Sequence, residues 1–238
     1  MSEKDFERIL VMDHDLLYGF SGFNLEYKNA FRDDSFDLVS YLCPGPYLSG
    51  VSSVDTDFVW YEECLRRSYF KLRGEVEDFP EYKQLIPYII VRANGLIFTY
   101  QRAGNEHRLD GKYSIGIGGH TNLSDLDHTG LNNIVRNAAL REISEELDFG
   151  KIVPPAVQFK IDWQLLCPRA FLYSGNSDSI VNHVHFGIVY VVDLEFKDFD
   201  DVTLREEGKK LDWMTKTELI ENSDNLEEWS RLVLEKCL

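Results

Sequence analysis

Hydrophobic and polar positions alternate most clearly in the second half of the chain. Residues 88–102, YIIVRANGLIFTYQR, contain two β-rich runs around Asn94-Gly95, which is the strongest short hairpin signal. Residues 131–147, LNNIVRNAALREISEEL, carry an apolar stripe at helical spacing. Residues 183–196, HVHFGIVYVVDLEF, form an apolar run rich in valine and aromatic residues, which predicts a central strand.

The C-terminal residues continue the alternation of strand and helix. Residues 211–221 predict a short strand near Trp213 followed by a helix, and residues 225–238 predict an amphipathic helix. The apolar positions of that last helix, which we expect to be buried, are Trp229, Leu232 and Val233. Interleaved helices and strands together with a tight hairpin favour an α/β (α+β) fold with a mixed sheet flanked by helices.

The first eighty residues are less regular. Residues 7–12, ERILVM, suit a short strand, whereas residues 57–74 suit either a strand or a helix. The acidic, proline-containing residues 75–82 mark a plausible boundary. We therefore expect an N-terminal extension or small subdomain over residues 1–80, packed on a core domain that spans residues 81–238 and ends in the C-terminal helix.

Charge and cysteine content narrow the class of protein. The 238 residues include 25 Lys and Arg against 41 Asp and Glu, a formal net charge of −16. Such a surface repels phosphate-rich polymers, so we expect neither nucleic acid nor an anionic membrane as a partner. The four cysteines show no zinc or disulfide spacing, and no apolar run suits a signal peptide or a membrane helix. We expect a cytoplasmic protein.

The predicted helix over residues 131–147 carries candidate chemistry. Glu142, Glu145 and Glu146 fall within an arc of about 100°, separate from the apolar stripe. These like charges repel each other near the helix C-terminus, where anions are unfavourable, so a bound cation would relieve them. Hard oxygen ligands of this kind select Mg²⁺ or Mn²⁺. The alternative is a solvated acidic face, which the spacing alone favours.

Residues 141–149, REISEELDF, resemble the second half of the Nudix box, Gly-x5-Glu-x7-Arg-Glu-U-x-Glu-Glu-x-Gly-U, in which U is a bulky apolar residue. The matching residues are Arg141, Glu142, Ile143, Glu145, Glu146 and Phe149. Asp148 replaces the last glycine, Asn133 the first glutamate and Asp127 the first glycine. Gly119, at the end of Gly-Ile-Gly-Gly, is the candidate counterpart of that first glycine, which implies an insertion near residues 121–130.

The order of strands and helix over residues 84–222 also resembles this family. The resemblance implies a Nudix-type α/β/α sandwich and hydrolysis of a diphosphate linked to another moiety, with Mg²⁺ or Mn²⁺ as cofactor. It implies that the metal ligands are Glu142, Glu145, Glu146 and the carbonyl of Gly119. The i, i+4 spacing of Arg141 and Glu145 lets the arginine fix the Glu145 carboxylate. The candidate substrate contacts are Arg102, Lys112 and His120, and the candidate bases are Glu206 and Glu207.

Two other functions stay open on the sequence. The altered first half of the box suits a Nudix-fold ligand-binding or regulatory module without turnover. An isopentenyl-diphosphate-isomerase-like enzyme ranks last, because no cysteine lies near the glycine pair. The expected partner is a small phosphorylated substrate. We hypothesise that residues 1–80 and the insertion carry specificity or a homodimer contact, and that His183 and His185 face one side of their strand, in the pocket or the core.

Overall fold

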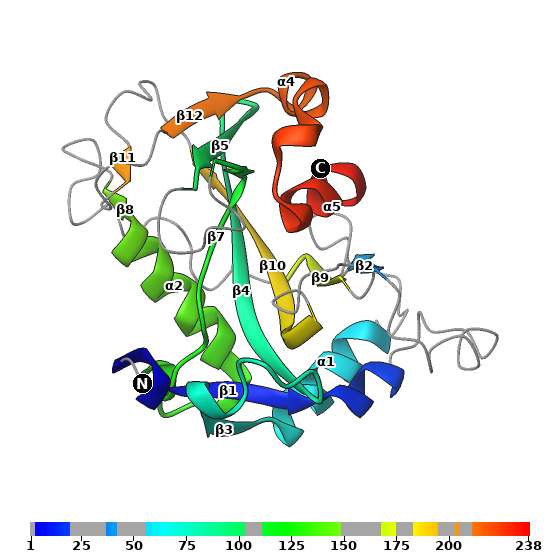
Figure 1. The fold of residues 1–238 in the computed structure, drawn as a ribbon, viewed down its shortest axis with the longest axis vertical. Coiled ribbons are helices and arrows are strands. Elements are labelled where there is room, and N and C mark those ends of the chain that lie inside the picture. Colours follow the sequence, from blue (N-terminus) through cyan, green and yellow to red (C-terminus); the bar gives the residue numbers. More distant parts are fainter. Residues whose placement is uncertain are drawn as a thin grey trace, which may run out of the picture.

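The computed structural model describes residues 3–19, 37–41, 56–102, 111–148, 168–174, 183–194, 203–204 and 211–238. A mixed sheet forms its centre (Figure 1). Along the main path of the sheet the strands are β12 (Leu211–Met214), β5 (Leu96–Gln101), β4 (Tyr82–Ala93), β10 (His185–Leu194), β9 (Ala170–Ser174) and β2 (Asp37–Tyr41). Strands β4 and β10 pair in parallel, and the other pairings are antiparallel.

Shorter strands extend this sheet. They are β1 (Arg8–Asp13), which pairs with β4 and with β3 (Tyr69–Leu72), β6 (Tyr113–Ser114), which pairs with β5, and β7 (Gly116–Gly118), which pairs with β4. A separate pair joins β8 (Leu147–Asp148) to β11 (Thr203–Leu204). The short 3-10 helices are Glu3–Phe6, His14–Gly19, Arg73–Glu75, Leu123–Asp125, Leu131–Asn133 and Ser223–Asn225.

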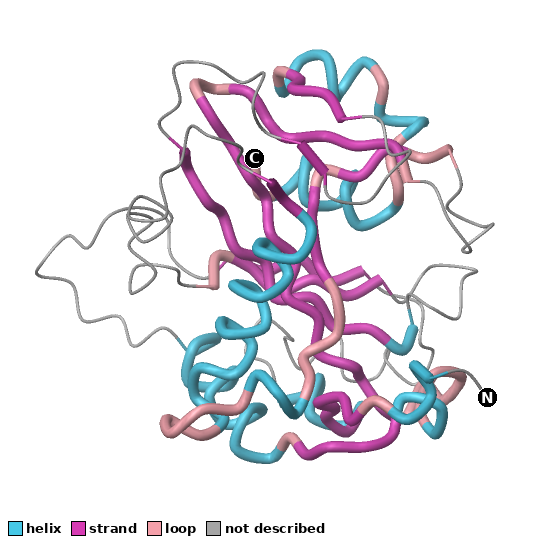
Figure 2. Tube along the Cα trace, turned by 90° about the vertical axis from the view of Figure 1, so that its left-hand side faces the viewer, coloured by secondary structure: helices cyan, strands magenta, loops and turns pink. Residues whose placement is uncertain are grey.

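Helices cover both faces of the sheet. Helices α1 (Thr56–Arg67) and α2 (Ile134–Glu146) share one apolar cluster with β4, β5 and β10. Helices α4 (Lys216–Glu221) and α5 (Glu228–Lys236) share a second apolar cluster on the opposite face. Figure 1 shows α2 and α5 on opposite sides of β4 and β10, and Figure 2 shows the strands running through the middle of the molecule. The predicted α/β/α sandwich with a mixed sheet is confirmed.

Strand β10 lies between β4 and β9, so both of its edges are paired, and helices cover both of its faces. Phe186, Ile188 and Tyr190 belong to the cluster of α2, whereas Val189 belongs to the cluster of α5. Burial on both faces explains why the strand reads as a continuous apolar run rather than an alternating one. The strand begins at His185, so His183 precedes it instead of alternating within it.

The hairpin between β4 and β5 turns at Asn94 and Gly95, whose φ angles are 50° and 81°. A two-residue turn with positive φ at both positions matches the right-handed twist of the paired strands, and Asn-Gly adopts it at low cost. The predicted hairpin is confirmed. It directs β5 back along β4 and places the segment after β5 beside the C-terminal residues, where Tyr113 bridges to Leu226.

The described residues before position 80 join the same sheet. Strand β1 pairs with the start of β4, and β2 pairs with β9. The ambiguous segment at residues 57–74 is helix α1 followed by strand β3. The division at residue 80 stays a prediction, but these strand pairings make the N-terminal segment part of the central sheet. Within the described ranges, no helix is long and apolar enough to cross a membrane.

Candidate functional site

Glu142 lies on α2 where the helix approaches the end of strand β7. Its side chain is buried, with 7% of the residue exposed, whereas the Glu145 side chain is 56% exposed. Gly119 follows β7 directly, and a Cβ added there would lie 2.3 Å from Oε1 of Glu142. Only glycine lets the backbone approach the carboxylate this closely. The structure thus brings together Gly119 and Glu142, two of the predicted metal ligands.

The surroundings of Glu142 disfavour the negative charge of its carboxylate. Burial raises the pKa of this carboxyl, and the neighbouring charges of Glu145 and Glu146 raise it further, against the opposing effect of Arg141. A buried carboxylate in low dielectric next to like charges is costly unless a cation compensates it. The electrostatics of α2 therefore favour a positive charge beside Glu142.

Arg141 supplies one such charge and connects several groups. Its Nε and Nη2 donate to the two carboxylate oxygens of Asp125, at 2.8 and 3.0 Å, and Nη2 also donates to the carbonyl of His120. Its Nη1 lies 2.7 Å from Oε1 of Glu142 and 3.0 Å from Oε2 of Glu145. Burial alone would lower the pKa of Arg141, but the carboxylates of Asp125 and Glu142 raise it, so the guanidinium stays charged.

His120 follows Gly119 and is partly buried. Its Nε2 is 2.6 Å from Oε1 of Gln84, and its ring packs edge-on against His185 with the centroids 5.4 Å apart. Burial, followed by the charge of His185, holds the pKa of His120 well below its usual range. Because an amide oxygen only accepts, Nε2 carries the proton of a neutral ring. The described contacts place His120 beside the glycine pair as a packed, neutral imidazole.

The structure ties Arg102 and Lys112 to the C-terminal segment. Nη1 of Arg102 lies 2.5 Å from Oε2 of Glu227, and Nζ of Lys112 donates to the carbonyl of Asp224 at 2.8 Å. Glu227 is itself buried and accepts hydrogen bonds from Ser114 and Tyr88. These contacts attach both cations to the residues that lead into α5, and their predicted role as phosphate contacts stays a prediction.

The donor set on α2 suits a hard divalent cation in its chemistry. Glu142, Glu145 and Glu146 offer carboxylate oxygens, and Gly119 leaves space for close approach of its carbonyl. Among the residues that the structure describes, however, no three acidic, histidine or cysteine side chains are grouped closely enough to hold an ion together. The three glutamates therefore do not converge on one point in this structure.

Sequence reasoning missed Asp125 and Glu227. Asp125 lies in the predicted insertion, at the end of the 3-10 helix Leu123–Asp125, and its carboxylate accepts the backbone N–H of Asn122. The spacing Asn-x-x-Asp was the one local signal available for it. Several candidates lie outside the described residues and are not placed: Phe149, Glu206, Glu207 and the cysteines Cys43 and Cys167.

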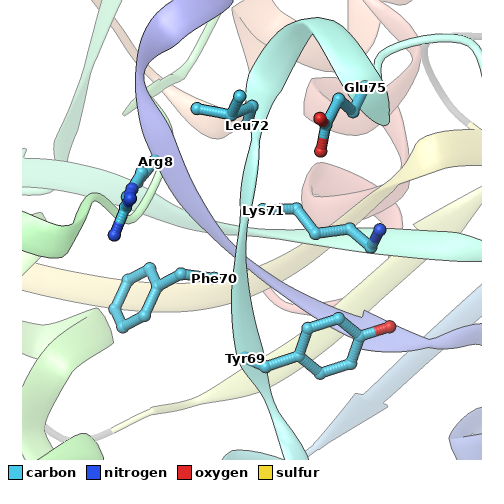
Figure 3. A pocket seen from close by; sticks show the side chains of 6 residues that line it. All are labelled: Arg8, Tyr69, Phe70, Lys71, Leu72 and Glu75. Carbon is cyan, nitrogen blue, oxygen red and sulfur yellow. The ribbon is translucent and has the colours of Figure 1, made fainter.

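A separate open hollow of about 470 Å³ runs along strand β3. Figure 3 shows the side chains that line it on both sides of the strand, with Phe70 and Arg8 on one side and Tyr69 and Lys71 on the other. Nζ of Lys71 also lies 4.6 Å from the centre of the Tyr82 ring. None of the predicted site residues lines this hollow.

Comparison with known proteins places this fold. No protein-family model matches the chain. Protein YmaB of Bacillus subtilis (strain 168) is 28% identical over 213 residues, which cover 87% of this chain and 94% of YmaB. The crystal structure of Tm1382, named as a candidate Nudix hydrolase, aligns with a TM-score of 0.65 at 21% identity, over 96% of this chain and 97% of Tm1382.

A second solved structure, the bifunctional NMN adenylyltransferase/ADP-ribose pyrophosphatase of Francisella tularensis, is 15% identical with a TM-score of 0.47, over 66% of this chain and 42% of that chain. The alignment with Tm1382 spans nearly the whole of both chains. The chain has the Nudix fold, and the resemblance seen in residues 141–149 is confirmed at the level of the fold.

Proposed function

We propose that this protein is a divalent-metal-dependent hydrolase of a diphosphate linked to another moiety, such as a nucleoside diphosphate derivative. The observation that supports it most directly is the approach of Gly119 to the buried carboxylate of Glu142. A purely structural helix gains nothing from burying one of three repelling glutamates against a backbone that only glycine permits. A cation bound there would offset the charge.

The residues that would hold Mg²⁺ or Mn²⁺ are Glu142, Glu145, Glu146 and the Gly119 carbonyl. When bound, such an ion withdraws charge from a diphosphate and helps to generate hydroxide from water. The chain's own part is to orient these oxygens. Arg141 contacts one oxygen of Glu142 and one of Glu145, and so restrains both side chains. The neutral ring of His120 adds no charge beside the glycine pair.

A second function has a specific observation in its favour. Nη1 of Arg141 lies between Glu142 and Glu145, where it partly compensates the charge that a metal would otherwise compensate. A Nudix-fold module that binds a ligand without turnover is compatible with this arrangement. The expected ligand is again a small phosphorylated molecule.

A substrate panel with Mn²⁺ separates the two functions. Nucleotide sugars, dinucleoside polyphosphates, ADP-ribose and nucleoside triphosphates are incubated with the full chain, and products are resolved by ion-exchange chromatography. The hydrolase proposal expects turnover of at least one class, abolished by EDTA and restored by added Mn²⁺. Tight binding of one compound by calorimetry, with no product from any of them, would replace the hydrolase by the ligand-binding module.

A further inference from the structure

Asp125 is the most buried carboxylate around Arg141. Its side chain is 3% exposed, compared with 10% for Glu142 and 56% for Glu145. It comes from the segment between Gly119 and α2, not from α2 itself. One of its oxygens also accepts the backbone N–H of Asn122 at 2.7 Å, which fixes the carboxylate within its own turn. Asp125 is thus an anchored partner for the guanidinium.

The first glutamate position of the Nudix box, just before α2, carries no charge in this chain. Asn133 stands there, and its Nδ2 donates to Oγ1 of Thr129 at 3.1 Å. Among the described residues, the carboxylates that contact Arg141 are Asp125, Glu142 and Glu145. Of these, only Asp125 lies outside the glutamates assigned to the metal.

The planar shape of the guanidinium determines what Arg141 can do. Because Nε and Nη2 form a bidentate pair with Asp125, only Nη1 faces the glutamates. Nη1 reaches Oε1 of Glu142 and Oε2 of Glu145, and the guanidinium leaves the second oxygen of each unused. If Asp125 lost its charge, the fork would turn and bind a glutamate bidentately, in competition with a cation.

We propose that Asp125 is a positioning residue of the site: it holds Arg141 side-on, so that Glu142 and Glu145 are restrained yet keep oxygens for a divalent cation. This inference rests on the proposed function. It assigns to the inserted segment a part in the metal site, and the specificity or dimer contact hypothesised from the sequence stays a prediction.

The test measures Mn²⁺ affinity by calorimetry and by electron paramagnetic resonance, on variants whose folding is verified by circular dichroism. Asp125→Asn removes the charge and keeps the shape. We expect it to weaken Mn²⁺ binding about 10- to 100-fold, the range for loss of a residue that orients metal ligands. Asp127→Asn is the matched control, because Asp127 is exposed and contacts Thr129 and Asn137. We expect wild-type affinity from that control.

An Arg141→Gln background tests whether Asp125 acts through Arg141. We expect Asp125→Asn to change Mn²⁺ affinity in the wild type but to have no further effect in Arg141→Gln. If Asp125→Asn alone does not fold, the double variant still provides a test, because it buries a neutral amide pair instead of the uncompensated charge that Arg141→Gln leaves at Asp125. A further loss of affinity in the double variant overturns the proposal.

The outcomes separate this inference from the proposed function. If the wild type binds Mn²⁺ and hydrolyses no compound, the hydrolase function fails while the affinity comparison still tests Asp125. If the wild type hydrolyses a compound and Asp125→Asn binds Mn²⁺ as tightly, the function stands and the positioning role is overturned. If Asp125→Asn and Asp127→Asn lose Mn²⁺ affinity equally, the effect comes from anchoring of the loop, and the positioning role of Asp125 is overturned. Absence of Mn²⁺ binding by the wild type overturns both.

Discussion

The backbone of Gly119 lies against the carboxylate of Glu142, so closely that a Cβ would stand 2.3 Å from Oε1 and 2.6 Å from Cδ. These two residues are 23 positions apart in the chain and belong to different elements, the end of β7 and the last turns of α2. Their contact joins the glycine-rich strand to the glutamate helix. It is the relationship on which the proposed metal site depends.

Gly119→Ala should displace the Glu142 carboxylate. The added methyl group has no space, and Glu142 is buried and held by Arg141, so we expect a loss of about 1–3 kcal/mol in the free energy of unfolding from overpacking. Mn²⁺ affinity and hydrolytic activity should fall by about tenfold or more. Urea denaturation and calorimetry measure the two effects.

Shortening the glutamate provides the control for this variant. In Gly119→Ala combined with Glu142→Asp, the carboxylate withdraws by one methylene group and the clash is relieved. Stability should recover toward the wild type while Mn²⁺ affinity does not. Wild-type activity in Gly119→Ala would show that the close approach has no part in function.

Glu146→Gln should remove activity and leave the fold intact. Glu146 is half-buried, and its charge raises the pKa of the Glu142 carboxyl, so its removal relieves repulsion. We expect the free energy of unfolding to change by less than about 0.5 kcal/mol. Turnover in the presence of Mn²⁺ should fall by about 100-fold or more. This loss exceeds the one expected for a residue that only orients a metal ligand.

Glu235→Gln is the matched control for Glu146→Gln. It makes the same change on α5, where Glu235 is exposed. Activity and stability should both equal those of the wild type. Unchanged turnover in Glu146→Gln would remove this residue from the metal site.

Glu227→Ala should destabilise the attachment of α5. The Glu227 side chain is 5% exposed and accepts from Arg102, Ser114 and Tyr88. Its removal leaves buried hydroxyl groups without their acceptor, whereas Arg102, at 35% exposure, regains water. We expect a loss of about 3 kcal/mol, the lower end for breaking a buried ion pair.

Urea denaturation followed by tryptophan fluorescence measures this loss. Glu221→Ala, at the exposed end of α4, serves as control and should change the free energy of unfolding by less than about 0.5 kcal/mol. A loss below about 1 kcal/mol for Glu227→Ala would mean that this network contributes little to stability.

Gly95→Ala should weaken the hairpin through the backbone alone. Gly95 has a φ of 81°, and no atom lies within 4 Å of an added Cβ, so no clash contributes. The left-handed conformation costs an ordinary residue about 1–2 kcal/mol, and we expect that loss in the free energy of unfolding. Gly95→Asn should lose less, because asparagine tolerates this conformation better. Equal losses for the two substitutions would contradict the conformational explanation.

Local patterns predicted the elements whose signals are local. The Asn94-Gly95 turn, the helix that carries Glu142 and the apolar strand β10 were all read from a few adjacent residues. Their backbone preferences and their hydrophobic periods act over one or two turns. The Nudix fold followed from the order of these elements together with the spacing of the glutamates, and the structural likeness to Tm1382 supports it.

Local sequence patterns could not predict the ion-pair and hydrogen-bond partners of the charged residues. Arg102 and Lys112 reach the segment before α5, more than a hundred positions away, and Arg141 reaches Asp125 in the insertion. The packing of the helices and strands decides which residues come within reach of a long side chain. The residue types alone leave several possible partners for each charge. The placement of strands β1 and β2 in the central sheet was likewise decided by non-local pairing.

The sequence by itself determined which residues of this protein can be helical, which can form strands and which carboxylates share one side of α2, because these properties depend on neighbouring positions. The tertiary structure alone decided that Glu142 is the buried glutamate of α2, that Gly119 is the glycine against it and that Asp125 holds Arg141. Burial and ion pairing arise only when distant segments pack together, and the charges of the site take their energies from that packing.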